Sequence, residues 1–336
     1  MRGSQDSNTS LFSEFSPRTR WLEVRLRVDN ETAEAVNEVF SRLGVGGAVW
    51  EQFPLEGADE IPEEVAGSFQ NCWIKAYLPV RTVAEELTQR RRIEEALWHL
   101  SQIRPIGEPE FKLLADEDWA EAWKATYRPI MLGQRLVIKP SWCEWQAKEG
   151  QIIIELDPGQ AFGTGLHPST QLCLIGLEKW LKPRQQVLDL GTGSGILAIA
   201  AAKLGAKDVL AVDIDSLAIE VAKENVRANR VDSIVQLVRG TLPPQDEADS
   251  LVVERAYQIA PAGFDLILVN ILADVIANML ARGLSDWLAP AGIMLASGII
   301  RERQLVVLEA MTIAGLEMIE QTEQGDWVAL VARKPL

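Results

Sequence analysis

Residues 187–195, VLDLGTGSG, constrain the fold more than any other stretch of this 336-residue chain. An apolar segment ends at Leu190 and runs directly into glycines at 191, 193 and 195, and ILAIAAAKLG then has the composition of a buried helix. Glycine lets a backbone turn sharply and lets a ligand approach without a Cβ in the way, and a helix N-terminus carries partial positive charge. The stretch therefore predicts a strand, a ligand-binding loop and a helix.

Strand and helix patterns alternate on both sides of this loop. Strands are expected at 186–190, 208–214, 234–240, 264–271 and 291–299, with helices between them and a strand pair at 315–334. Apolar strands separated by helices are typical of a doubly wound sheet that is mainly parallel. The final pair can supply an antiparallel edge strand. Residues 241–263 look like an insertion before the fourth strand.

Residues 20–115 show a different order of elements. Strands are expected at 21–29, 46–52, 72–80 and 108–115, with helices at 30–44 and 82–100. This β-α-β-β-α-β order is typical of a small ferredoxin-like α+β domain. We therefore divide the chain into a disordered, Ser-rich tail at 1–19, this domain at 20–115, a linker at 116–135 and the doubly wound domain at 136–336. Residues 105–130 are the candidate hinge between the two domains.

The spacing of the glycines distinguishes between kinds of nucleotide loop. A phosphate-binding P-loop requires a lysine after its last glycine, and Ile196 stands there instead. The dinucleotide loop Gly-x-Gly-x-x-Gly, counted from Gly191, also requires a glycine at Ile196. The Gly-x-Gly-x-Gly spacing, preceded by Asp189, is similar to the S-adenosylmethionine loop of class I methyltransferases. A glycine-rich turn that binds no ligand is the remaining alternative.

Two polar side chains are expected at the carboxyl ends of neighbouring strands. Asp213 ends the strand after the glycine loop, where a carboxylate can accept hydrogen bonds from both hydroxyls of a ribose. Asp215 is assigned instead to capping the next helix. Asn270 ends the fourth strand, at the edge where ligands bind in open α/β sheets. Many amino-directed methyltransferases carry Asn-Pro-Pro-aromatic here, whereas Ile271 and Leu272 follow Asn270, so an aromatic residue to stack on a flipped nucleobase is missing.

The stretch DPGQAFGTGLHPST at 157–170, together with VLDLGTGSG and with NIL at 270–272, resembles the methyltransferase family of large-subunit ribosomal protein L-eleven. The resemblance covers 110–336 and includes DWAEAWK, LVIKPSW, SGI and DWVALVARK. Residues 20–115 match the family's small substrate-recognition domain in layout. The resemblance implies a class I methyltransferase fold, an α/β Rossmann-like sheet of seven strands, preceded by the ferredoxin-like domain. The segment 241–263 departs from the family's shorter pattern.

The same resemblance implies that S-adenosylmethionine is the cofactor, bound by Thr170, Gly191, Asp213 and Asn270, with Gly193 in the same loop. It implies an N-methyltransferase that moves methyl groups to lysine side chains and to the N-terminal α-amine of protein L-eleven. We predict that Asn270 is the catalytic residue and that it orients the amine. His167 is either a general base or a structural residue of its tight loop.

Charge and composition narrow the class of partner. Lysine plus arginine number 33 against 48 aspartate plus glutamate, and the net charge of −15 opposes phosphate backbones and suits a basic partner. Five carboxylates from Glu56 to Glu64 are either a loop that steers such a substrate or a solvated loop. No apolar run reaches the length of a membrane span. Cys72, Cys143 and Cys173 match neither a disulfide framework nor a metal site, so we expect reduced thiols, no metal and a cytoplasmic protein, which we take to be a monomer.

Two other classes of function stay open. One is methylation of another protein or of amino groups in RNA or DNA, and the acidic charge and the missing Pro-Pro-aromatic sequence argue against the nucleic acids. The other is a cofactor-binding module without catalysis, and the intact residues Gly191, Asp213 and Asn270 argue against it.

Overall fold

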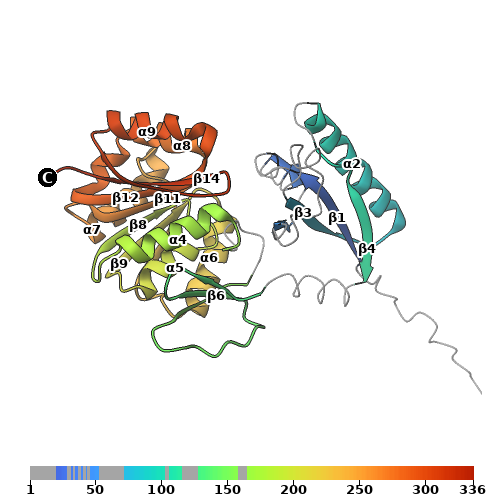
Figure 1. The fold of residues 1–336 in the computed structure, drawn as a ribbon, viewed down its shortest axis with the longest axis horizontal. Helices are drawn as coiled ribbons and strands as arrows, with labels where there is room; N and C mark the ends of the chain where they lie inside the picture. The colour runs from blue at the N-terminus through green and yellow to red at the C-terminus, as the bar shows by residue number, and fades with distance from the viewer. Residues whose placement is uncertain are drawn as a thin grey trace, which may run out of the picture. The chain divides into compact units, whose positions relative to one another are not determined.

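The computed structural model describes residues 20–28, 46–52, 72–102, 106–115, 128–157 and 165–336, and also Thr32, Ala35, Val36, Val39, Phe40 and Leu43. The chain divides into two compact units, residues 1–124 and 125–336 (Figure 1). The predicted tail at 1–19, the acidic loop at 56–64 and most of the predicted linker lie outside the described residues. The limits assigned to the domains from the sequence therefore stay predictions.

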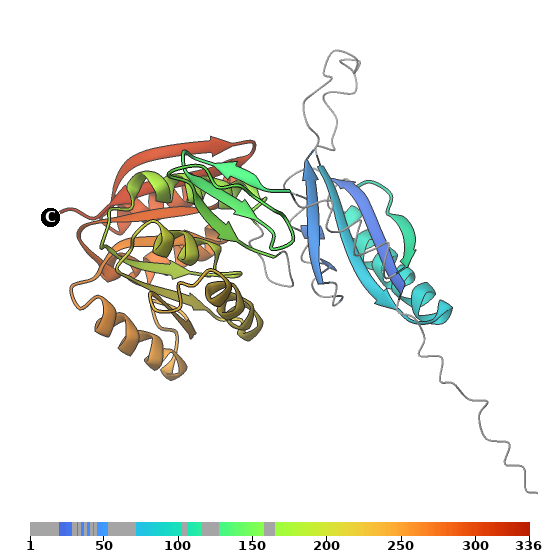
Figure 2. The ribbon, with the colours of Figure 1, turned by 90° about the horizontal axis from the view of Figure 1, so that it is seen from below.

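The described part of the N-terminal unit is an antiparallel sheet of four strands with helix α2 (Val83–Ser101) on one face (Figures 1 and 2). The strands are β1 (Arg20–Val28), β2 (Gly46–Gln52), β3 (Cys72–Val80) and β4 (Glu110–Ala115), in the order β2-β3-β1-β4. Every second residue of β1 is buried, in a core that α2 shares. This core includes Leu22, Val24, Leu26, Val28, Val36, Phe40, Ile93 and Leu97. The arrangement is the predicted ferredoxin-like one.

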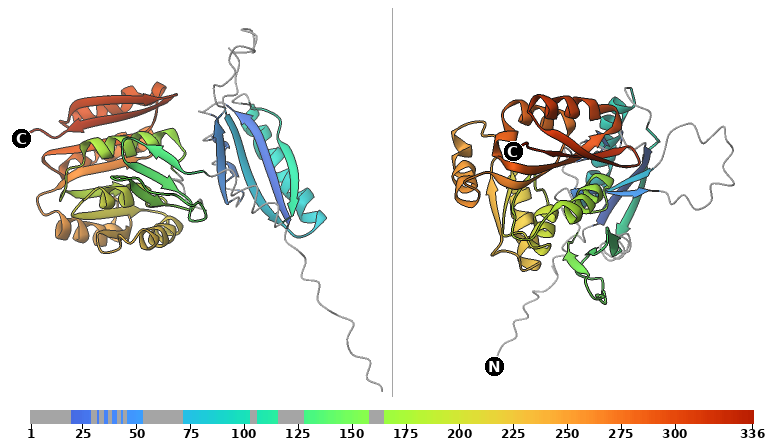
Figure 3. Two further views of the ribbon diagram at one scale, coloured as in Figure 1. Left: turned by 60° about the horizontal axis from the view of Figure 1, so that its bottom comes forward. Right: turned by 60° about the vertical axis from the view of Figure 1, so that its left-hand side comes forward.

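The described residues of the second unit contain a seven-stranded sheet of the order β10-β9-β8-β11-β12-β14-β13. Five strands are parallel: β8 (Gln186–Leu190), β9 (Asp208–Asp213), β10 (Val235–Arg239), β11 (Phe264–Asn270) and β12 (Leu288–Ile300). The hairpin of β13 (Glu317–Gln324) and β14 (Trp327–Arg333) adds two antiparallel strands at one edge (Figure 3). This sheet confirms the predicted doubly wound, Rossmann-like fold.

Helices cover both faces of this sheet. One hydrophobic core includes α4 (Pro168–Trp180), α5 (Ile196–Lys203) and α6 (Ser216–Ala228), and the other includes α7 (Ser250–Ile259), α8 (Ala273–Ala281) and α9 (Gln304–Ile313). A small sheet of β5 (Ile130–Leu132), β6 (Leu136–Lys139) and β7 (Ile152–Glu155) joins the first core (Figure 2). The sequence analysis did not predict β5. Within the described part of the chain, no helix combines the length and the apolar character needed to cross a membrane.

Two expectations about the second unit are wrong. Residues 241–263 are not an added insertion, because they contain α7, whose Val252, Ala256 and Ile259 are buried in the second core. The parallel strands β10 and β11 require a crossover connection, and α7 supplies it. The helix expected between the strands at 264–271 and 291–299 does not fill that interval: it ends at Ala281, because Gly283 takes a φ of +94° and a short 3-10 turn follows.

Candidate active site

Three glycines in left-handed conformations carry the chain from β8 into α5. The φ angle is +70° at Gly191, +53° at Gly193 and +82° at Gly195, a region that residues with a Cβ rarely adopt. A Cβ on Gly191 would also lie 2.6 Å from Cγ2 of Ile271, and one on Gly195 would lie 3.2 Å from Cβ of Ala222. A side chain at Gly191 or Gly195 would therefore be crowded, and the loop presents the exposed backbone of Gly191 to a ligand.

Asp189 of β8 holds this loop from inside the protein. Its buried carboxylate accepts hydrogen bonds from Oγ1 of Thr192 (2.6 Å) and from the backbone N–H of Ala198 (3.1 Å). Burial raises the pKa of Asp189 to about 7, although both hydrogen bonds favour the ionised form. In the sequence Asp189 is only the residue that precedes the glycine motif, whereas these contacts show that it ties the loop to α5.

Asp213 ends β9, beside β8, and its carboxylate contacts the glycine loop. Oδ2 accepts a hydrogen bond from the N–H of Gly193 (2.9 Å), and Oδ1 accepts one from the N–H of Asp215 (3.0 Å). Each carboxylate oxygen keeps a further lone pair, which can accept from a hydroxyl of a ribose. Asp215 caps α6 as predicted, because its Oδ1 accepts from the N–H of Leu217 (2.9 Å). Ile214 is 68% exposed and offers an apolar surface at the same edge.

Asn270 ends β11, on the other side of β8, and it contacts Thr170 in the first turn of α4. Nδ2 of Asn270 donates a hydrogen bond to the buried Oγ1 of Thr170 (3.2 Å), across 100 residues of sequence. Among the described residues, Oδ1 of Asn270 is buried and has no hydrogen-bond partner. An unsatisfied buried acceptor costs about 1–3 kcal/mol. Such an atom indicates a place for a donor on a ligand.

The five residues predicted to bind the cofactor converge on one edge of the sheet. β8, β9 and β11 are neighbouring parallel strands, so the positions after their last residues lie side by side. Gly191 and Gly193 follow β8, Asp213 and Asn270 end the strands on either side, and Thr170 joins them from α4. Their contacts with a cofactor stay a prediction.

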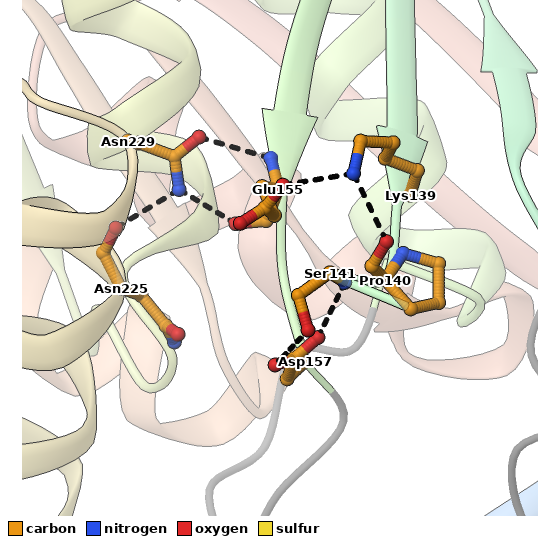
Figure 4. Close-up of polar contacts among 7 residues, drawn as sticks. All are labelled: Lys139, Pro140, Ser141, Glu155, Asp157, Asn225 and Asn229. Carbon is orange, nitrogen blue, oxygen red and sulfur yellow. Dashed lines mark hydrogen bonds and ion pairs between the residues drawn. The ribbon is translucent and has the colours of Figure 1, made fainter. Parts of the chain in front are cut away.

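The stretch 157–170 starts from β7, which side chains tie to its neighbours (Figure 4). Asn229, the C-cap residue of α6, accepts a hydrogen bond from the N–H of Glu155 (2.9 Å) and donates one to the carbonyl of Glu155 (2.6 Å). Ser141, just after β6, donates to the carboxylate of Asp157 through its N–H (2.6 Å) and its hydroxyl (2.7 Å). The start of the stretch is thus held both by the end of α6 and by the segment that follows β6.

The far end of the stretch 157–170 packs on the start of α5, directly after the glycine loop at 191–195. Gly165 has a φ of +81°, and a Cβ on it would lie 3.0 Å from Cδ1 of Ile196, the first residue of α5. Asn225 of α6 donates to the carbonyl of Ser194 (2.8 Å), and its own carbonyl accepts from Nδ2 of Asn229 (2.9 Å). α6 therefore holds both β7 and the glycine loop after β8, so the two glycine-rich stretches share one support.

His167 caps α4, which begins at Pro168. Nδ1 of His167 accepts a hydrogen bond from the N–H of Ser169 (3.2 Å) and lies 2.7 Å from its Oγ. The ring packs edge-on against Trp327, with centroids 4.4 Å apart. Burial lowers the pKa of His167 to about 4, so the ring is neutral at pH 7. No group of three or more potential metal ligands occurs among the described residues.

This arrangement defines a class of protein. A glycine loop after the first strand, a carboxylate at the end of the second and an asparagine at the end of the fourth stand in a seven-stranded sheet with an antiparallel hairpin at its edge. The chain is a class I S-adenosylmethionine-dependent methyltransferase.

Comparisons with known proteins are more specific. The family Ribosomal protein L11 methyltransferase (PrmA) matches residues 20–335. A ribosomal protein L11 methyltransferase of Chloroflexus aurantiacus is 46% identical over 331 residues, which cover 94% of this chain and 99% of the relative. One of Herpetosiphon aurantiacus is 41% identical over 94% of this chain and 100% of the relative. A crystal structure of ribosomal protein L11 methylase from Lactobacillus delbrueckii subsp. bulgaricus is 34% identical, with a TM-score of 0.52 over 62% of this chain and 100% of that chain. The chain belongs to the ribosomal protein L11 methyltransferase family.

Proposed function

We propose that this chain transfers methyl groups from S-adenosylmethionine to lysine side chains and to the N-terminal α-amine of ribosomal protein L11. Membership of the family supports the substrate. Within the structure, the observation that carries the proposal is Oδ1 of Asn270, a buried acceptor without a partner among the described residues, beside the glycine loop.

The residues at this edge fit the cofactor. Gly191 exposes its backbone to a ligand, and Asp213 has lone pairs for both ribose hydroxyls. Thr170 and Asn270 bound the site on the side of α4. When bound, S-adenosylmethionine supplies a methyl group that its sulfonium makes electrophilic. The chain's own residues hold the two reactants in line, and alignment of this kind is a large source of rate enhancement.

Asn270 orients the target amine in this proposal. Thr170 takes up the Nδ2 side of the amide, so Oδ1 keeps a fixed direction and accepts an N–H of the amine. Only a neutral amine has the lone pair that attacks, while a free lysine has a pKa of about 10.4 and an α-amine one of about 7.7–8.0. Removal from water lowers the pKa of an amine. Because the amide oxygen of Asn270 carries no charge, it does not reverse this lowering of the amine's pKa.

His167 is not the general base in this proposal. Its Nδ1 is engaged in capping α4, and burial lowers its pKa to about 4. A base with so low a pKa is poorly matched to an amine whose own pKa is about 8 or higher.

The partner is a basic protein, and several finer features belong to the same proposal. The net charge of −15 favours a basic protein over a nucleic acid. We propose a cytoplasmic monomer that acts without nucleic acid. Movement of the two units about the segment at 105–130 would bring several amines of one substrate to the site, and the carboxylates from Glu56 to Glu64 would steer a basic substrate.

The test incubates the full chain with radiolabelled S-adenosylmethionine and L11 that lacks its methyl groups. We expect label on L11 that resists RNase, and a loss of at least about 100-fold in kcat for Asn270→Ala. The matched control is Asn278→Ala, because Asn278 is exposed on α8 and should be replaceable without effect. Absence of label on L11 refutes the substrate, label that RNase removes indicates an RNA substrate, and wild-type turnover of Asn270→Ala refutes its catalytic role.

A further inference from the structure

The first turn of α4 lies inside the protein. His167 is 6% exposed, and Ser169 and Thr170 are each 1% exposed. The N–H groups in the first turn of a helix have no partner within the helix, so burial makes a cap necessary. Pro168 has no N–H to satisfy, and Nδ1 of His167 accepts from the N–H of Ser169.

Further contacts on both sides fix this turn. Nε2 of Gln171 donates to the carbonyl of Leu166 (2.9 Å), and its Oε1 accepts from Nε2 of Gln324 in β13 (2.8 Å). The ring of His167 packs edge-on against Trp327 of β14, which is fully buried. The turn is therefore held between its own loop and the antiparallel hairpin at the edge of the sheet.

Thr170 links this turn to the reactive edge. Its backbone belongs to the turn that His167 caps, and its hydroxyl accepts from Nδ2 of Asn270. An amide group has a donor side and an acceptor side, so a partner for Nδ2 decides where Oδ1 points. A displaced Thr170 would free the amide to rotate, and Oδ1 would lose its direction.

We propose that His167 is a positioning residue for methyl transfer: by capping α4 it sets the Thr170 hydroxyl, which holds the Asn270 amide with Oδ1 toward the target amine. The inference rests on the proposed role of Asn270. It gives His167 no contact with the reacting atoms.

The cap requires an unprotonated Nδ1, because a nitrogen that carries a proton cannot accept a hydrogen bond. The backbone N–H of Ser169 can only donate, so the ring proton is assigned to Nε2. Burial lowers the pKa of His167 to about 4, which keeps the lone pair of Nδ1 available at neutral pH.

Three variants of His167 separate a cap from a base. Asparagine places an oxygen where Nδ1 stands and is among the best N-cap residues, whereas alanine has no acceptor and is a poor cap. We expect His167→Ala and His167→Gln to lower the kcat of the folded enzyme by about 10- to 100-fold. His167→Asn should restore kcat to within about threefold of wild type, with an unchanged pH–rate profile.

A double-mutant cycle tests the path through Thr170. Thr170→Val removes the hydroxyl and keeps the shape of the side chain, so it should lower kcat as His167→Ala does. In the Thr170→Val background, His167→Ala should change kcat by less than about twofold, because the link is already broken. Circular dichroism and thermal unfolding establish the folded fraction of each variant, so that kcat refers to folded enzyme.

Each outcome supports the positioning role or refutes it. Wild-type kcat in His167→Ala, an equal defect in His167→Asn and His167→Ala, or independent effects of His167→Ala and Thr170→Val would refute it. Failure of the proposed function is distinguishable, because wild type then leaves L11 unlabelled; failure of the proposed role of Asn270 shows as wild-type turnover in Asn270→Ala whatever the His167 variants do. If Asn270→Ala is inactive while His167→Ala is fully active, the inference about His167 alone is wrong.

Discussion

Gly298 in β12 gives a sharp test of the site's geometry, because its backbone touches the residue after Asn270. Its φ is +77°, and a Cβ on it would lie 2.9 Å from both the N and the C of Ile271 and nearer still to the carbonyl oxygen. These are backbone atoms, so no side chain can move aside. An alanine at 298 must displace Ile271, and with it Asn270.

Gly315 provides the matched control. Its φ is +74°, almost that of Gly298, and a Cβ on it would meet nothing within 4 Å. A left-handed alanine costs about 1–2 kcal/mol at either position. Crowding at Gly298 adds about 1–3 kcal/mol, so Gly298→Ala should destabilise the protein by about 2–5 kcal/mol and Gly315→Ala by about 1–2 kcal/mol.

Urea unfolding and methyl-transfer kinetics measure the two effects separately. A shift of about 1 Å in a positioning group can cost about 100-fold in rate, so Gly298→Ala should lose kcat to that extent while Gly315→Ala keeps it. Equal unfolding free energies and equal kcat values in the two variants would refute the close approach between Gly298 and Ile271, and with it the reasoning that this contact fixes Asn270.

Three further predictions follow from buried polar groups. Burial raises the pKa of Asp189 from 3.8 to about 7, so the folded protein favours the protonated carboxyl. The resulting contribution to the free energy of unfolding is fully present below pH 3.8 and is lost as the pH rises through about 7. The unfolding free energy of wild type relative to Asp189→Asn should thus fall by about 1.4 kcal/mol per pH unit over that range, and a pH-independent difference would contradict the assignment. Burial also raises the pKa of the Cys173 thiol, so iodoacetamide with peptide mapping should label the partly exposed Cys143 in the native protein and Cys173 only after unfolding. Asn229→Ala removes two hydrogen bonds to the Glu155 backbone and should lower the unfolding free energy by about 2–4 kcal/mol in urea; no change would mean that water replaces them.

Local patterns predicted most of the fold because several of its signals are local. The strand ranges at 46–52, 72–80 and 186–190 match β2, β3 and β8, since their composition is a local signal. Asp215 was assigned as a cap from its place before a helix, and its Oδ1 makes that bond. Such features depend on neighbours within a few residues.

The errors have identifiable physical causes. α4 starts at Pro168 because proline suits the first helical position, and a histidine in the N-cap position hides that start from propensity rules. Gly283 interrupts an otherwise apolar helical pattern through its left-handed φ, which the sequence alone does not reveal. The buried face of α7 is visible only against the sheet, so residues 241–263 resemble an insertion when the sequence is taken alone.

The candidate site could be predicted as a set of residues but not as a set of contacts. Spacing after strands identified Gly191, Asp213 and Asn270, because parallel strands end at one edge. The hydrogen bond between Thr170 and Asn270 spans 100 residues and depends on how α4 packs, so no local pattern contains it. The raised pKa of Asp189 is likewise not contained in a local pattern. Its partners Thr192 and Ala198 are near in sequence, but burial in the folded protein raises the pKa.

The charges beneath the site suit the proposed chemistry. A protonated histidine near the cofactor would repel its sulfonium, and burial keeps His167 neutral. A carboxylate at position 270 would stabilise the ammonium form of the target and raise its pKa, which reduces the fraction of amine able to attack. In the proposed role, Asn270 would accept an N–H without that penalty, and the hydrogen bond to Thr170 holds the Asn270 amide. Oδ2 of Asp213 accepts from the N–H of Gly193 in the glycine loop, and Asp213 lies on the opposite side of β8 from Asn270. In the proposed function, the order of strands β9-β8-β11 thus separates the carboxyl group that would bind the cofactor's ribose from the amide oxygen that would orient the amine.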